Sequence, residues 1–191
     1  MSESGKVIIL SAPSGTGKSS IIRHLMSTRP DLRLQFSISA TNRLPREGEQ
    51  DGRDYYFLNT DEFRKKIEAG EFVEWEEVYE GTLYGTLMSE VKEKVERGDT
   101  VIMDIDVMGS LNVKKSFGEK ALSIFILPPS IQELETRLRN RGTDSEHEVA
   151  RRLAKAGFEM TYAPRFDSVV INDDFFKAAD EVAEKIKKFN P

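Results

Sequence analysis

The chain contains no cysteine and only two histidines, His24 and His147. Without cysteine it can form no disulfide bond, no thiolate nucleophile and no thiolate zinc site. The two histidines lie far apart in the sequence, so a histidine metal cluster is not expected, and we interpret both as ordinary helix residues. If the protein uses a metal ion, the composition favours Mg²⁺ bound by oxygen ligands.

Long apolar runs and an excess of positive charge are also absent. No apolar stretch is long enough to cross a bilayer, and the first one, residues 7–10, is too short for a cleaved signal. We therefore expect a cytoplasmic protein with no membrane partner. Lys and Arg number 28 against 33 Asp and Glu, a net charge of −5. Because nucleic-acid affinity comes mainly from an excess of basic residues, no nucleic-acid partner is expected, and any anion must be held by local arginines.

Apolar runs that favour β-strands alternate with helical patterns along most of the chain. Strands are expected at residues 6–10, 100–103, 122–127 and 169–171, and helices near 18–28, 87–97, 130–140, 146–162 and 174–189. This alternation predicts an α/β fold with a parallel sheet covered by helices on both faces. Capping boxes are expected at 130–133 and 145–148, and Gly70 and Gly98 are expected to end helices.

Two segments interrupt the alternation. Between about 34 and 86, short aromatic stretches at 54–58, 71–78 and 82–84 are separated by glycines, which predicts a small, mostly antiparallel insertion. A second insertion, at about 140–145, lies between two arginine-bearing helices and is interpreted as part of a short lid at about 138–155. We therefore expect a single domain of 191 residues with a core at about 1–33 and 87–191.

Residues 12–20 read APSGTGKSS, directly after the first strand and directly before the first helix. A glycine-rich turn that opens a helix is typical of a phosphate-binding loop, in which backbone N–H groups surround a polyphosphate. Lys18 would reach the outer phosphates and Ser19 would hold Mg²⁺. The usual pattern begins with glycine where this chain has Ala12. The alternative is a plain Gly/Ser turn between a strand and a helix.

A second group of residues with a possible binding role follows in the segment 36–57. Arg43 and Arg46 flank Pro45, and a tyrosine pair, Tyr55 and Tyr56, comes shortly after. Proline stiffens the loop, so both guanidinium groups can be held toward one anion such as a phosphate monoester. The alternative is a solvated loop with ordinary surface arginines.

Together these motifs resemble those of guanylate kinases of the bacterial type, in the family of nucleoside monophosphate kinases with a phosphate loop. The resemblance is carried by SAPSGTGKSS at 11–20, SISATNRLPREGE at 37–49, DYYF at 54–57, EFVEW at 71–75, YGT at 84–86, DID at 104–106, FILPPS at 125–130, LRNRG at 138–142 and VINDD at 170–174. It implies ATP-dependent phosphorylation of GMP to GDP by direct in-line transfer with Mg²⁺. The insertion would hold GMP and the lid would close over ATP.

The resemblance also implies roles for individual residues on the GMP side. The residues that would hold the GMP phosphate are Arg43, Arg46, Tyr55 and Tyr84, and those that would contact guanine are Ser39, Glu74, Thr86 and Asp106. A carboxylate such as Glu74 can accept both the N1–H and the exocyclic amino group of guanine, whereas adenine presents an acceptor at the first position. Taken without the neighbouring motifs, Glu74 is better interpreted as a residue that faces water from an alternating strand.

On the ATP side, the residues implied to bind the nucleotide are Ser14, Gly15, Thr16, Gly17, Lys18, Ser19, Ser20, Arg137, Arg141 and Asn172. Lys18, Arg43, Arg137, Arg141 and Arg152 would stabilise the transferring phosphoryl group, and Asp104 would hold the metal with Ser19. Two alternatives remain open for these side chains. Asp104 could instead cap the following helix, and the helical arginines could form a solvated face.

Two other functions remain possible at this point. A guanylate-kinase-like interaction module keeps the fold without catalysis, although such modules typically lose residues of the phosphate loop. A kinase for another small phosphorylated acceptor would keep Lys18 and the arginines but would have no use for Glu74 and Asp106. The sequence is compatible with a monomer and with a homo-oligomer.

Overall fold

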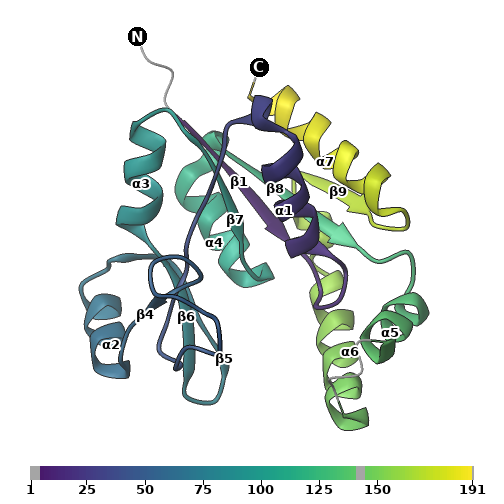
Figure 1. The fold of residues 1–191 in the computed structure, drawn as a ribbon, viewed down its shortest axis with the longest axis horizontal. Coiled ribbons are helices and arrows are strands. Elements are labelled where there is room, and N and C mark those ends of the chain that lie inside the picture. The colour runs from purple at the N-terminus through teal and green to yellow at the C-terminus, as the bar shows by residue number, and fades with distance from the viewer. Residues whose placement is uncertain (1–4, 141–144, 191) are drawn as a thin grey trace.

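Two β-sheets organise the computed structural model, which describes residues 5–140 and 145–190 (Figure 1). The large sheet is parallel throughout, with the strand order β2-β7-β1-β8-β9. Its strands are β1 (Lys6–Ser11), β2 (Leu34–Phe36), β7 (Thr100–Asp104), β8 (Ala121–Leu127) and β9 (Ser168–Ile171). The predicted α/β fold class is confirmed.

Helices cover both faces of the large sheet, and alternate residues of β1 divide between them. Ile8 and Leu10 pack in one cluster with α1 and α7, whereas Val7 and Ile9 pack on the other face with α3 and α4. Because both faces are covered, the strands are apolar along nearly their whole length. The helices of the core are α1 (Lys18–Thr28), α3 (Met88–Glu96), α4 (Val107–Phe117), α5 (Ile131–Asn140), α6 (Glu146–Met160) and α7 (Phe175–Phe189).

The small sheet has the strand order β4-β3-β6-β5, and only its β3–β4 pair is parallel. Its strands are β3 (Ala40–Thr41), β4 (Tyr56–Phe57), β5 (Phe72–Tyr79) and β6 (Thr82–Leu87), and it carries the helix α2 (Thr60–Glu68). Phe63 of α2 stacks on Phe72 of β5 with ring centroids 4.5 Å apart, which fixes the helix on the sheet. β2 belongs to the large sheet, so the small sheet begins only after Phe36.

Most predicted helices have close to the predicted bounds, and their ends follow the expected chemistry. Ser145 and Glu148 form a reciprocal capping box, and the Glu133 N–H donates to Ser130 Oγ at 3.1 Å. Gly70 and Gly98 have φ of 68° and 86° just after α2 and α3. The sequence analysis did not predict α4.

Residues 141–144 of the predicted lid lie outside the described residues, so its described parts belong to α5 and α6. Figure 1 shows the small sheet and α2 on one side of the lower half of the molecule and α5 and α6 on the other. Within the described ranges, no helix combines the length and the apolar character that a membrane crossing needs.

Candidate active site

The loop between β1 and α1 depends on two glycines. Gly15 and Gly17 have φ of 93° and 97°, a backbone region that other residues rarely adopt. A Cβ atom at position 15 would lie 2.8 Å from Leu138 Cδ2, and one at position 17 would lie 2.7 Å from Asn172 Nδ2. Both positions therefore require glycine for the backbone conformation and for space.

Side chains from distant parts of the chain hold this loop from behind. Asn172, which follows β9 and is buried, donates from Nδ2 to the carbonyl oxygen of Thr16 at 2.6 Å. Arg137 of α5 in turn donates from Nη1 to the carbonyl oxygen of Asn172 at 3.0 Å. On the outer side of the loop, Arg152 Nη1 donates to Ser14 Oγ at 2.7 Å. The loop is thus fixed by both α5 and α6.

Lys18 and Ser19, the first residues of α1, meet Asp104 at the end of β7. Lys18 Nζ lies 2.7 Å from Asp104 Oδ1 and also donates to the carbonyl oxygen of Ile105 at 3.1 Å. Ser19 Oγ donates to Asp104 Oδ2 at 2.7 Å. The hydroxyl and the carboxylate form a pair of oxygen ligands suited to Mg²⁺. Asp104 does not cap the following helix, because Asp106 does so by accepting from Gly109 N at 2.8 Å.

Arg43, after β3, is held in one orientation by several partners. Its Nη1 and Nη2 donate to the two carboxylate oxygens of Glu49 at 2.6 and 2.8 Å, and its Nε donates to Tyr84 OH at 3.0 Å. The guanidinium carbon lies 4.9 Å from the centre of the Tyr55 ring. The hydrogen bonds from Arg43, followed by that from the Arg46 N–H, lower the pKa of Glu49 to about 2. Arg43 is therefore already paired with a carboxylate, whereas Arg46 is exposed.

Glu74, on β5, is only 7% exposed, so it is not a solvated surface residue. Its Oε1 accepts a hydrogen bond from Thr86 Oγ1 on β6 at 2.8 Å. Burial raises the pKa of Glu74 to about 7, and the nearby negative charge of Asp106 acts in the same direction. The site therefore contains a buried carboxyl group that changes charge near neutral pH.

One open cavity of about 530 Å³ joins these groups. The predicted site residues that line it are Ser14, Gly15, Gly17, Lys18, Ser19, Ser20, Ser39, Arg46, Tyr55, Glu74, Tyr84, Asp104, Asp106 and Arg152. Five others do not line the cavity. Arg43 and Thr86 donate hydrogen bonds to the lining residues Tyr84 and Glu74, whereas Arg137, Asn172 and Thr16 form a chain of hydrogen bonds behind the loop. Arg141 lies outside the described residues. The cavity thus reaches from the phosphate loop to the small sheet.

Comparison with known proteins identifies the family. The model of the guanylate kinase family matches residues 4–189. A guanylate kinase of Bacteroides thetaiotaomicron is 53% identical over 97% of this chain and 90% of its own length. The chain belongs to the guanylate kinase family. As a member of it, the chain is a nucleotide-binding transferase, a nucleoside monophosphate kinase.

Two further guanylate kinases resemble this family member along nearly its whole length. The guanylate kinase of Porphyromonas gingivalis is 52% identical over 96% of this chain and 97% of its own length. A crystal structure of the guanylate kinase from Anaplasma phagocytophilum has a TM-score of 0.77 at 29% identity, covering 97% of this chain and 86% of the other. The large parallel sheet with flanking helices is thus the fold of this kinase family.

Several polar side chains of this kinase's site were not selected by sequence reasoning. Arg23, Lys155 and Glu159 line the cavity, from α1 and α6. Glu76 lies two residues beyond Glu74, so both point to the same face of β5, and this alternation was the signal that could have identified it. Burial, together with Asp106, raises the pKa of Glu76 to about 8. The helical residues carried no comparable signal, because isolated charges on helices are usually solvated.

Proposed function

We propose that the protein transfers the γ-phosphoryl group of ATP to GMP, giving ADP and GDP, by direct in-line transfer with Mg²⁺. The phosphate loop holds the ATP phosphates, and the small sheet holds GMP. The observation that carries the proposal is the single cavity lined both by the phosphate loop and by Glu74, Tyr55 and Tyr84. The two phosphates that react can therefore meet in one place.

Guanine selection is assigned to Glu74 with Thr86, Ser39 and Asp106. When ionised, the Glu74 carboxylate accepts from N1–H and from the 2-amino group of guanine, while Thr86 fixes its orientation. Adenine would place a lone pair opposite the buried carboxylate, a mismatch that costs on the order of several kcal/mol. GMP is therefore the expected acceptor, rather than AMP.

The transfer step requires positioning and charge compensation more than proton transfer. The phosphate of GMP is anionic near neutral pH and needs no general base to attack the γ-phosphorus. Lys18 and the arginines Arg137, Arg141 and Arg152 offset the charge of the transferring group, and Arg43 and Arg46 orient the acceptor phosphate. Ser19 and Asp104 would hold Mg²⁺, which when bound neutralises phosphate charge. The scarcity of histidine and the absence of cysteine agree with this chemistry.

A coupled assay of ADP release with GMP, AMP and ribose 5-phosphate as acceptors tests the proposal, together with calorimetric titration of GMP and AMP. We expect ADP release with GMP and a strong preference for GMP in both measurements. Equal turnover of AMP or ribose 5-phosphate would assign a different acceptor. GMP binding without ADP release would instead favour an interaction module that has lost catalysis.

A further inference from the structure

The small sheet is joined to the core by two connections that lie side by side. The first runs from the end of β2 through residues 37–39 to β3, and the second runs from β6 directly into α3. Glu90 is the third residue of α3 and therefore lies beside the second connection. Any change in the angle between the small sheet and the core must bend the chain here.

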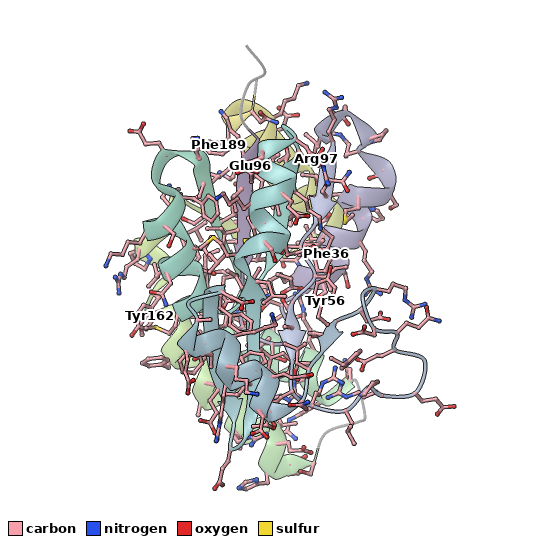
Figure 2. All side chains as sticks on the ribbon, turned by 90° about the vertical axis from the view of Figure 1, so that its left-hand side faces the viewer. Phe36, Tyr56, Glu96, Arg97, Tyr162 and Phe189 are labelled. Atoms are coloured by element: carbon pink, nitrogen blue, oxygen red, sulfur yellow. The ribbon has the colours of Figure 1, made fainter. Side chains whose placement is uncertain are left out.

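Glu90 and Lys94 bind the first connection from α3. Glu90 Oε1 accepts from the backbone N–H of Ile38 at 3.1 Å, and Lys94 Nζ donates to the carbonyl oxygen of Phe36 at 2.8 Å and to Glu90 itself. Glu90 Oε2 accepts from Tyr56 OH of β4 at 3.0 Å. Figure 2 shows Phe36 and Tyr56 close together on the side of the molecule where α3 and α2 face the viewer.

The Glu90–Lys94 ion pair is largely buried, unlike a second ion pair with the same spacing on α3. The side chains of Glu90 and Lys94 are 10% and 16% exposed, whereas those of Lys92 and Glu96 are 66% and 64% exposed. Although burial opposes ionisation of Glu90, its bonds from Lys94, Ile38 and Tyr56 keep its pKa below the ordinary value. Glu90 therefore remains a charged acceptor for three donors from three segments.

We propose that Glu90 and Lys94 form a hinge clamp that sets the orientation of the small sheet relative to the core and thereby positions the acceptor site. The bonded residues Ile38 and Tyr56 are the immediate neighbours of Ser39 and Tyr55, which line the cavity. Among the described residues, the hydrogen bonds of Glu90 are to Ile38, Tyr56 and Lys94 and not to the phosphate loop, so Glu90 acts on the acceptor side. This inference rests on the proposed binding of GMP at the small sheet. Glu90 is thus a positioning residue and not a catalytic one.

Steady-state kinetics with separate GMP and ATP titrations test the clamp in the variants Glu90→Ala, Glu90→Gln and Tyr56→Phe. Because small misplacements of a reactant can lower rates a hundredfold, we expect Glu90→Ala to lower kcat/KM for GMP about 10- to 100-fold. The KM for ATP should change less than about twofold, since the phosphate loop is untouched. Glu90→Gln retains an acceptor for Ile38 N–H and should restore most of the loss, and Tyr56→Phe should show an intermediate effect.

The control is Glu96→Ala, which removes the exposed pair on the same helix and should leave both KM values unchanged. Thermal melts of every variant separate folding from positioning. Parallel changes in the KM for GMP and for ATP, or a GMP KM in Glu90→Ala equal to that of the control, would overturn the clamp. If Glu90→Ala does not fold, Tyr56→Phe decides by the same criterion. Failure of the proposed function itself would be distinguishable, because the wild type would then show no saturation with GMP.

The absence of cysteine allows a direct test of the hinge. Arg64→Cys on α2 and Lys115→Cys on α4, both exposed, give two spin-label positions on either side of it. In the ligand-free protein we expect the distance distribution to broaden or shift with Glu90→Ala and to stay unchanged with Glu96→Ala. Identical distributions in all three proteins would contradict the proposed clamp.

Discussion

Replacing Glu74 by glutamine should stabilise the protein while removing its preference for GMP. The carboxyl group is buried, and its pKa in the folded protein is about 7 instead of 4.5. A group whose pKa is raised on folding stays protonated in the folded state over a pH range in which the unfolded chain ionises it. The folded state therefore loses stability as the pH rises from 4.5 to about 7.

The magnitude follows from this difference in pKa. Between pH 4.5 and about 7, the free energy of unfolding falls by about 1.4 kcal/mol for each pH unit. Ionisation of Glu74 therefore lowers the free energy of unfolding by about 3 kcal/mol in total. For a chain of this size that corresponds to about 6–12 °C in melting temperature. Glutamine keeps an acceptor for Thr86 Oγ1 and carries no charge. We expect Glu74→Gln to melt higher than the wild type at pH 8 and at nearly the same temperature at pH 5.

Binding should show the opposite effect of the same charge. Only the ionised Glu74 accepts both guanine donors, so the affinity for GMP should fall about tenfold between pH 8 and pH 6. The GMP phosphate also titrates, near about pH 6. The measured quantity is therefore the ratio of wild-type to Glu74→Gln affinity at each pH, in which that contribution cancels. Calorimetry gives the affinities, and Glu80→Gln, an exposed glutamate after the same strand, is the control. A pH-independent ratio, or a Glu74→Gln variant that melts below the wild type at pH 8, would refute the reasoning.

Three further predictions concern the loop and the acceptor side. Lys18→Ala should lower kcat by about a thousandfold or more, because a preorganised charge on the transferring group is lost, with little change in melting temperature; ADP release measures this. Gly17→Ala should weaken ATP binding strongly and cost about 1–3 kcal/mol of stability, since a methyl group would lie 2.7 Å from Asn172 Nδ2 at a φ of 97°. Nucleotide titration with chemical denaturation tests it, and normal ATP affinity would contradict it. Arg43→Lys should raise the KM for GMP about tenfold or more with an unchanged KM for ATP, because lysine cannot reproduce the fork that binds Glu49 and Tyr84. Steady-state kinetics that leave the GMP KM unchanged would contradict this role of the guanidinium group.

The sequence predicted the parallel core well because its signals are local. Strands covered on both faces are continuous apolar runs, and the Ser145 capping box and Gly98 mark helix ends through neighbouring residues. The glycine pattern at residues 15–17 likewise predicted a turn that the structure contains.

The helix α4 was missed because its sequence satisfies a need of the site rather than of the helix. Gly109 lies inside it, and glycine is a poor helix former. A Cβ atom at this position would lie 2.7 Å from Glu74 Oε2, so the helix gives up propensity to leave room for the buried carboxyl group. That requirement comes from Glu74 on β5 of the small sheet, and it cannot be seen in the sequence of the helix itself.

Contacts made by polar side chains were equally hidden. The pairing of Arg43 with Glu49 and the contacts of Glu90 depend on the three-dimensional arrangement of loops whose sequences are simply polar. For the same reason, burial of Glu74 could not be distinguished from exposure by alternation alone. The sequence predicted candidate site residues by their type, and the tertiary structure determines their burial and their partners.

The bond from Asn172 to the Thr16 carbonyl joins residues 156 positions apart. Closing so long a stretch of chain carries a large entropic cost, which is recovered only when β9 pairs with β8. During synthesis, the glycine-rich loop therefore reaches the conformation described above only after Asn172 has left the ribosome. A nascent chain that ends before Asn172 contains the glycine-rich segment without the hydrogen bond that fixes it.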